Sequence, residues 1–168
     1  YFPYARQDKR FLPGEAISAL VLAEILYKAG IKRIYTLDVH NPKAFASYGK
    51  RFINISTRDA WAEYISRIQE SNGGKVGLIA PDEGREFIGS IAELCDAEWT
   101  YFRKVRDLES GKIVSHEPAE EDAFNSILRS SKIIMIIDDI IATGGTLAGV
   151  VSRLRKEGFE GDIYVGGT

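Results

Sequence analysis

Residues 132–158, KIIMIIDDIIATGGTLAGVVSRLRKEG, decide how this chain folds. The apolar run at 133–137 has the length of a buried strand and contains no polar residue, which is typical of a parallel strand covered on both faces. Four apolar residues then recur at the spacing of one helical face, namely Leu147, Val150, Val151 and Leu154. Gly158 follows Lys156, as expected where a helix ends. The stretch therefore predicts a strand, a loop at its carboxyl end and a helix.

The predicted loop has the composition of a site for a phosphate monoester. It comprises Thr143, Gly144, Gly145 and Thr146, directly after the acids Asp138 and Asp139 and two isoleucines with an alanine. Glycines let the backbone approach a ligand closely, and N–H groups at a helix N-terminus attract anions. The threonine hydroxyls can donate, and the carboxylates can accept from sugar hydroxyls or bind Mg²⁺. An ordinary strand, turn and helix with solvated acids is the plainer alternative.

Composition narrows the class of protein. The chain has 168 residues, 45% of them hydrophobic and 27% charged, which suits one globular domain with a core of its own. The net charge of -2 gives no electrostatic reason to expect nucleic acid or an anionic membrane as partner. No apolar run has the length of a membrane span. Because the first residue is Tyr1 rather than Met, the lack of a targeting signal carries no weight.

The only cysteine, Cys95, excludes an internal disulfide and is expected to be buried on a helix. A reducing, cytoplasmic location is compatible with this, and it is the location we expect.

Strand and helix patterns alternate along the chain. Strands are predicted at 33–39, 51–55, 76–80, 99–103, 133–137 and 162–165. Helices are predicted at 15–29, from Thr57 to the break at Asn72, at 86–95, at 121–129 and from 147 onward. The first helix is expected to turn Ile17, Leu20, Val21 and Ile25 inward. Residues 106–121 are polar and show no period. The alternation predicts an α/β fold, a doubly wound and mainly parallel sheet with helices on both faces, as one domain over residues 1–168.

The strand, the two acids and the Thr-Gly-Gly-Thr loop together resemble the 5-phosphoribosyl-1-diphosphate (PRPP) motif. Type I phosphoribosyltransferases and PRPP synthetases share this motif. The resemblance implies that residues 143–146 hold a 5-phosphate, and that Asp138 and Asp139 hold ribose hydroxyls, directly or through Mg²⁺.

A second resemblance lies in residues 1–9, YFPYARQDK, which are similar to the ATP-binding segment of ribose-phosphate diphosphokinases, the PRPP synthetases. It implies that Arg6, Gln7 and Asp8 bind the nucleotide. Aromatic and charged side chains can stack a base and bind phosphates. Taken alone, the segment would more simply be a frayed terminus with solvated charges.

Two further loops resemble segments of the same family. Asp38-Val39-His40 is similar to its Asp-Leu-His segment, and an Asp and a His two apart on an extended chain point to the same face. The resemblance implies that the two bind Mg²⁺-ATP together, Asp38 as an oxygen ligand or an orienting residue and His40 on a phosphate or the metal, whereas the plainer alternative is a surface histidine. Residues 41–43 depart from the commoner family wording. Asp82, in Pro-Asp-Glu-Gly, resembles the family's metal- or ribose-binding Asp, although such a sequence is also a common β-turn.

Lys104 and Arg106 fit the family's Lys-x-Arg at the root of a catalytic flap. The resemblance implies that these cations stabilise charge on a transferring phosphoryl group and that 107–112 form a lid over the nucleotide. A solvated hairpin is the alternative. His116 is expected to be exposed to solvent.

The resemblance runs through nearly the whole chain and implies a ribose-phosphate diphosphokinase that uses ATP, ribose 5-phosphate and Mg²⁺. We expect the chain to be the family's C-terminal domain, without the N-terminal homologous domain and the tail. We also expect a homo-oligomer with the nucleotide site near a subunit interface. A phosphoribosyltransferase that consumes PRPP and a non-catalytic regulatory homologue remain as alternatives. P-loop, Rossmann and zinc motifs are absent from the sequence.

Overall fold

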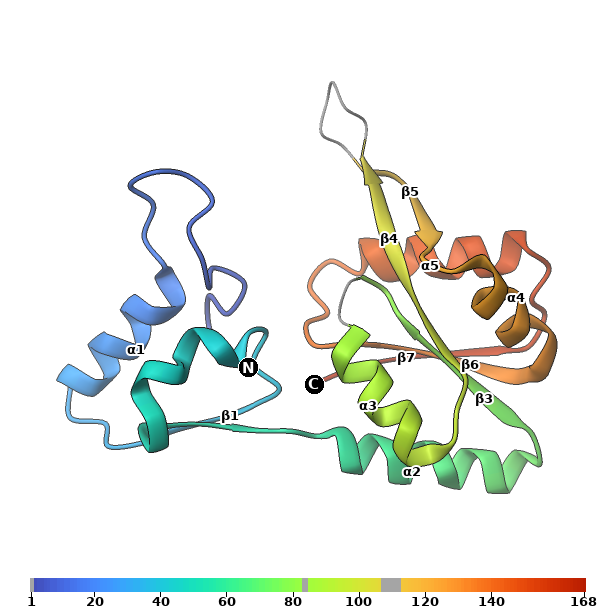
Figure 1. Cartoon of the computed structure of the whole chain (residues 1–168), viewed down its shortest axis with the longest axis horizontal. Helices are drawn as coiled ribbons and strands as arrows, with labels where there is room; N and C mark the ends of the chain where they lie inside the picture. Colours follow the sequence, from blue (N-terminus) through green and yellow to red (C-terminus); the bar gives the residue numbers. More distant parts are fainter. Residues whose placement is uncertain (1, 83–84, 107–112) are drawn as a thin grey trace. The chain divides into compact units, whose positions relative to one another are not determined.

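The computed structural model describes residues 2–82, 85–106 and 113–168 (Figure 1). Contacts along the chain divide it into two compact units, one of residues 1–57 with Thr168 and one of residues 58–167. We call them the N-terminal unit and the C-terminal unit and describe each by itself. That residues 1–168 form a single domain stays a prediction.

The N-terminal unit consists of two helices and a short parallel sheet. In chain order it contains α1 (Ser18–Lys28), β1 (Ile34–Leu37), the 3-10 segment η1 (Pro42–Arg51) and β2 (Phe52–Ile55). Its core is aromatic: the Phe2 ring lies 5.4 Å from the rings of both Phe45 and Phe52, and these two stack at 3.9 Å. Burial of aromatic rings is the main stabilising term available to such a small unit.

The expected inward face of α1 is wrong. Its buried residues are Ala19, Ala23 and Tyr27, whereas Val21 and Ile25 are 47% and 57% exposed. The small alanine side chains let the rest of the unit pack closely against the helix. The Arg51 guanidinium lies over the Tyr27 ring, with its Cζ 3.9 Å from the ring centroid. A period of apolar residues identifies stripes on a helix, but the neighbours decide which stripe is covered.

The C-terminal unit is a five-stranded sheet covered by helices. Its strands are β3 (Lys75–Ala80), β4 (Trp99–Arg106), β5 (Ile113–Pro118), β6 (Ser131–Asp138) and β7 (Asp162–Gly167). Its helices are α2 (Arg58–Asn72), α3 (Arg85–Cys95), α4 (Glu121–Ser130) and α5 (Gly145–Lys156). The strand order is β5-β4-β3-β6-β7, and each neighbouring pair is parallel except β4 with β5.

Helices lie on both faces of the sheet (Figure 1). Alternate side chains of its strands enter two separate cores. Leu78 and Met135 face one core, with Ile65 of α2 and Ile91 of α3. The other core lies against α4 and α5, and its members include Ile79, Ile134, Ile136, Phe124, Leu147, Val150 and Leu154. A strand buried on both faces requires an uninterrupted apolar run, and 133–137 supplies it. The predicted doubly wound, mainly parallel fold is confirmed.

Two further observations bear on the sequence predictions. Cys95 is buried, its thiol donates to the Ile91 carbonyl at 3.2 Å, and burial raises the pKa of that thiol, as expected for a packing residue. Among the described residues, none of the helices is both long and apolar enough to cross a membrane.

Strand β5 lies within 106–121, for which no regular structure was expected. Phe102 and Pro118 are register partners, and so are Lys104 and His116. The strand is a mixed, polar segment whose pairing with β4 defines it, so its own sequence carries little period-2 signal.

Candidate functional site

Charged side chains gather at the carboxyl ends of the central strands of the C-terminal unit. Strand β3 lies between β4 and β6, so Asp82 after β3, Lys104 on β4 and Asp138 at the end of β6 occupy neighbouring positions at this edge. The Lys104 Nζ donates to Asp82 Oδ2 at 3.3 Å. The two side chains are only 27% and 33% exposed, so solvent screens this pair less than one on an open surface.

Asp138 is the buried acid of the group, with 8% of its surface exposed. Burial raises its pKa to about 7, aided by a hydrogen bond with the Asp139 side chain and by the charges of Asp82 and Asp139. The Asp139 N–H donates to Asp138 Oδ1 at 2.9 Å, which works in the opposite direction. Three carboxyl groups therefore lie close enough to influence one another, as expected where cations or sugar hydroxyls bind.

The Thr-Gly-Gly-Thr loop leads directly into α5. Gly144 precedes the helix with a φ of +76°, a left-handed conformation that glycine adopts readily. The Gly145 N–H donates to Thr143 Oγ1 at 3.5 Å, and the Thr143 side chain is exposed. Buried Leu147 and Val150 fix the first turns of α5 to the sheet. The structure thus places an exposed, glycine-containing helix N-terminus after Asp138, which can attract an anion.

His116 differs from its prediction. It is partly buried rather than exposed to solvent, because it pairs across the sheet with Lys104 and its imidazole packs against Gly149 of α5. Its Nε2 atom is buried without a hydrogen-bond partner among the described residues. Burial, and then the charge of Lys104, lowers the pKa of His116.

Sequence reasoning missed this contact of His116. The sequence did contain one signal for it, Gly149 in the middle of the predicted helix. A glycine inside a helix often marks a place where another group packs closely against the backbone.

The predicted flap continues from Lys104 to Arg106 and residues 107–112. The backbone of Arg106 ends β4, but its side chain and all of 107–112 lie outside the described residues, so the roles predicted for them stay predictions.

Residues 2–9 of the N-terminal unit are anchored, contrary to the frayed-terminus alternative. Phe2 and Ala5 are buried, and the Gln7 N–H donates to the Tyr4 carbonyl at 2.8 Å. The side chains of Arg6 and Gln7 are exposed. Buried anchors combined with exposed polar side chains leave the latter accessible to a ligand.

Asp8 belongs to the same segment, and its carboxylate forms a hydrogen bond within the N-terminal unit. Its Oδ2 accepts from Asn41 Nδ2 at 2.6 Å, and Asn41 Oδ1 in turn accepts from the Lys43 N–H at 3.2 Å, capping η1. Asp8 thereby connects residues 2–9 to the loop of His40.

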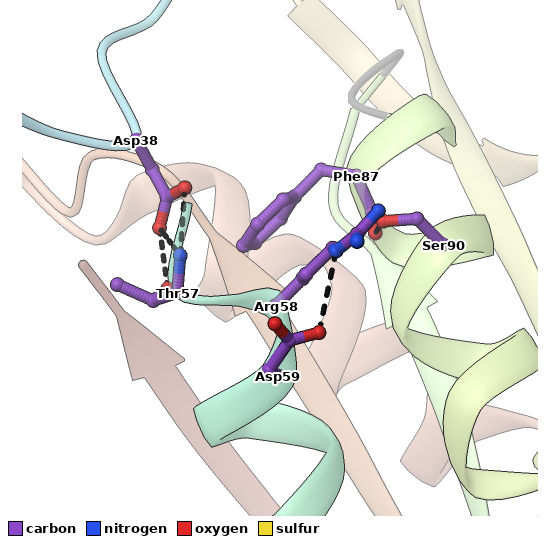
Figure 2. A network of polar contacts seen from close by, with 6 residues as sticks. All are labelled: Asp38, Thr57, Arg58, Asp59, Phe87 and Ser90. Atoms are coloured by element: carbon purple, nitrogen blue, oxygen red, sulfur yellow. Dashed lines mark hydrogen bonds and ion pairs between the residues drawn. The ribbon is translucent and has the colours of Figure 1, made fainter. Parts of the chain in front are cut away.

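Hydrogen bonds fix the loop that carries His40, and those between Asp38 and Thr57 are drawn in Figure 2. The Asp38 carboxylate accepts from the Thr57 N–H at 3.2 Å and from the Thr57 hydroxyl. The Val39 N–H donates to Asn54 Oδ1 at 2.8 Å, and His40 itself is exposed.

The expectation that Asp38 and His40 share a face of an extended chain is wrong at the backbone. Asp38 has a φ of +34°, and β1 ends at Leu37. Asp38 therefore orients the loop through Thr57, and its carboxylate is engaged in doing so.

Figure 2 also shows the beginning of α2 in the C-terminal unit. Arg58 forms an ion pair with Asp59 at 3.3 Å, and its guanidinium points toward α3 at Phe87 and Ser90. The Ser90 hydroxyl donates to the Phe87 carbonyl at 2.7 Å. These contacts belong to the packing of the two helices, and they involve none of the predicted site residues.

The predicted metal ligands, His40 and Asp82, belong to different units. Within the part of the chain that the structure describes, no group of three or more His, Cys, Asp or Glu residues stands in a metal-holding arrangement. Asp82, Asp138 and Asp139 nevertheless supply oxygen donors of the kind that Mg²⁺ prefers.

Comparison with known proteins assigns the class. The chain belongs to the family of the phosphoribosyl transferase domain, which matches residues 55–164. Within that class it is similar to ribose-phosphate pyrophosphokinases: it is 39% identical to that of Methanobrevibacter smithii over 162 residues, which are 94% of this chain and 53% of the relative. The corresponding protein of Methanopyrus kandleri is 31% identical over 165 residues, covering 98% and 53%.

A solved structure agrees. The chain is similar to the crystal structure of phosphoribosylpyrophosphate synthetase from Mycobacterium smegmatis, with a TM-score of 0.80 and 26% identity. The match covers 100% of this chain and 51% of the synthetase chain. The resemblance to the PRPP synthetase family that the sequence indicated is confirmed. The chain spans about half the length of the relatives it matches.

Proposed function

We propose that this chain is part of a ribose-phosphate diphosphokinase, which transfers the diphosphoryl group of ATP to the 1-hydroxyl of ribose 5-phosphate and gives PRPP and AMP. The names of its relatives support this activity. The observation that carries it is the contact of Lys104 with Asp82 beside the Asp138–Asp139 pair, at the strand edge from which the phosphate-type loop starts.

Ribose 5-phosphate would lie over the end of β6. The 5-phosphate accepts from N–H groups and hydroxyls of 143–146, where the N-terminus of α5 adds favourable potential. Asp138 and Asp139 accept from the ribose hydroxyls. The 1-hydroxyl is the group that attacks the diphosphoryl donor.

The reaction forms a bond from the 1-oxygen to the β-phosphorus and breaks the bond from that phosphorus to the oxygen bridging it to the α-phosphate. AMP leaves with the bridging oxygen, and the hydroxyl proton passes to solvent. No covalent protein intermediate is needed, so positioning and charge stabilisation do the catalysis. Lys104, with Arg106 as its predicted companion, stabilises negative charge on the transferring group.

Mg²⁺ is part of the proposal. The ion supplies charge neutralisation for the phosphates of ATP, and oxygens of Asp82, Asp138 and Asp139 fit it. A divalent cation would also relieve the repulsion that helps raise the Asp138 pKa. For the N-terminal unit by itself, His40 is proposed to bind a phosphate or the metal ion of Mg²⁺-ATP.

The nucleotide is assigned to the N-terminal unit. Exposed Arg6 and Gln7 would bind ATP, while Asp8 acts by holding the His40 loop through Asn41. The proposal further includes a homo-oligomer with the nucleotide near a subunit interface, and a cytoplasmic location.

The match to the phosphoribosyl transferase domain favours one second candidate, an enzyme that consumes PRPP by attack of a base at its C1. Incubation with ATP, Mg²⁺ and ribose 5-phosphate, followed by chromatography for AMP, separates the two. The proposal predicts AMP and PRPP in equal amounts. Formation of nucleotide from PRPP and a base without any AMP from ATP would replace it, and no turnover by the native protein would favour the non-catalytic homologue.

A further inference from the structure

A histidine and a glycine fit together on the side of the Lys104 strand that faces α5. An ideal Cβ built on Gly149 would lie 2.4 Å from His116 Nδ1 and 2.8 Å from its Cε1. No two such atoms approach so closely, so the imidazole occupies the space that the missing side chain leaves. The ring therefore lies close to the backbone of α5 at Gly149.

Glycine is a costly choice at this position. Gly149 stands in the middle of α5, where alanine would favour the helix more strongly. Its φ is not in the left-handed region, so the backbone does not require glycine there. The close approach of His116 is the remaining physical reason for glycine at this position.

The same histidine is the cross-strand partner of Lys104. Residues directly opposite on antiparallel strands project to one face of the sheet and contact each other. Lys104 in turn donates to Asp82 at 3.3 Å. The imidazole thus stands between a helix that begins at the Thr-Gly-Gly-Thr loop and the strand that carries the cation of the site.

We propose that His116 is a positioning residue for Lys104: seated in the space left by Gly149, its ring fixes β4 and β5 against α5 and holds the ammonium group at Asp82. The inference rests on the proposed function for the task of Lys104, but the packing it describes can be measured without turnover. Its buried Nε2, without a partner among the described residues, fits a ring retained for its shape and place.

The test inserts a methyl group into this contact. Gly149→Ala should displace the ring, His116→Ala should remove it, and the double variant should relieve the clash. Gly89→Ala is the matched control, since Gly89 is also a helical glycine whose added Cβ would meet an aromatic ring, that of Trp99 at 3.1 Å. Lysine labelling with an amine-reactive reagent, read by mass spectrometry, reports the environment of Lys104. Lys75, paired with Glu98 at 3.6 Å, is the internal reference.

Gly149→Ala should raise the labelling of Lys104 several-fold and leave that of Lys75 unchanged. In the assay for AMP it should lower kcat about tenfold, with little change in KM for ribose 5-phosphate, because a small misplacement of a catalytic group lowers the rate more than binding. His116→Ala should change both readouts in the same direction, because the ring that holds Lys104 is absent. The double variant should match His116→Ala, since the added methyl group then meets no ring, and Gly89→Ala should match the native protein.

Native-like labelling of Lys104 and native kcat in folded Gly149→Ala would overturn the inference. Should that variant fail to fold, recovery of folding in the double variant supports the contact and no recovery overturns it. If the labelling changes as expected but the native protein makes no AMP, the positioning of Lys104 holds and the proposed function fails.

Discussion

The two units hold their candidate site residues in different ways. In the C-terminal unit, Asp82, Lys104 and Asp138 lie at the carboxyl ends of packed parallel strands, and burial raises the pKa of Asp138. In the N-terminal unit, Arg6 and His40 are exposed on loops that are fixed by hydrogen bonds beneath them, such as those of Asp38. Under the proposed function, regular elements hold the partly buried charges that act in the chemistry, and loops fixed by hydrogen bonds present the side chains that recognise the nucleotide.

The largest effect should come from the cation of the C-terminal unit. Lys104→Ala should lower kcat by about 10²–10³-fold with a modest effect on KM, because the ammonium acts mainly on charge in the transition state. Steady-state assay of AMP formation measures it. Lys75→Ala, which removes a cation of the same unit at a surface ion pair, is the control. Equal kcat in both variants would assign catalysis elsewhere.

The second effect concerns the affinity for ribose 5-phosphate, which Asp139 should increase. Asp139→Asn should raise KM for ribose 5-phosphate roughly tenfold, since an amide replaces a charged acceptor for ribose hydroxyls. Isothermal titration with ribose 5-phosphate in the presence of Mg²⁺ gives the same quantity as an affinity. Unchanged affinity would show that the ribose lies away from the end of β6.

Burial of charge in the C-terminal unit should appear in the pH dependence of stability. The pKa of Asp138 is about 7 in the folded protein, against 3.8 when unfolded. Between these values the folded state retains a proton that the unfolded state has lost. This group's stabilisation is therefore complete below pH 4 and is lost as the pH rises toward 7 and above.

In the variant Asp138→Asn the side chain stays neutral at every pH, so it carries no buried charge as the pH rises. Relative to the native protein, the variant should thus gain roughly 2–4 kcal/mol of unfolding free energy between pH 4 and pH 8. Urea unfolding at several pH values without divalent cations measures the difference. The matched control is Asp162→Asn, an exposed acid at the start of β7. A constant difference between native and Asp138→Asn would mean that Asp138 is ionised throughout.

The smallest effect concerns the hydrogen bond between Asn41 and Asp8 in the N-terminal unit. Asn41→Asp places two carboxylates at the present 2.6 Å contact but keeps the oxygen that caps η1. It should weaken the local structure by about 1–2 kcal/mol. The swap Asp8→Asn with Asn41→Asp should restore it, because donor and acceptor then exchange places. Hydrogen exchange at Ala5 and Gln7, with KM for ATP, reports the change. A swap no better than Asn41→Asp alone would show that the contact does not hold the loop.

The same contrast explains what could be predicted from the sequence. Strand β6, its loop and α5 follow from an apolar run and a helical period, and both signals are local. The contacts of Asp8 with Asn41 and of Asp38 with Thr57 join residues far apart in sequence, and the left-handed backbone of Asp38 has no composition signal. His116 was misplaced for a similar reason, since only its pairing with β4 and its packing on Gly149 determine its burial.

The central claim is that the loop after β6 binds the phosphate of a phosphosugar whose hydroxyls meet Asp138 and Asp139. A crystal structure of the protein soaked with ribose 5-phosphate, ATP and Mg²⁺ tests it most directly. We predict the 5-phosphate within hydrogen-bond distance of Thr143 and the N–H groups of Gly144 and Gly145. Ribose 5-phosphate bound at another place, with this loop closed off by packed side chains, would contradict the account.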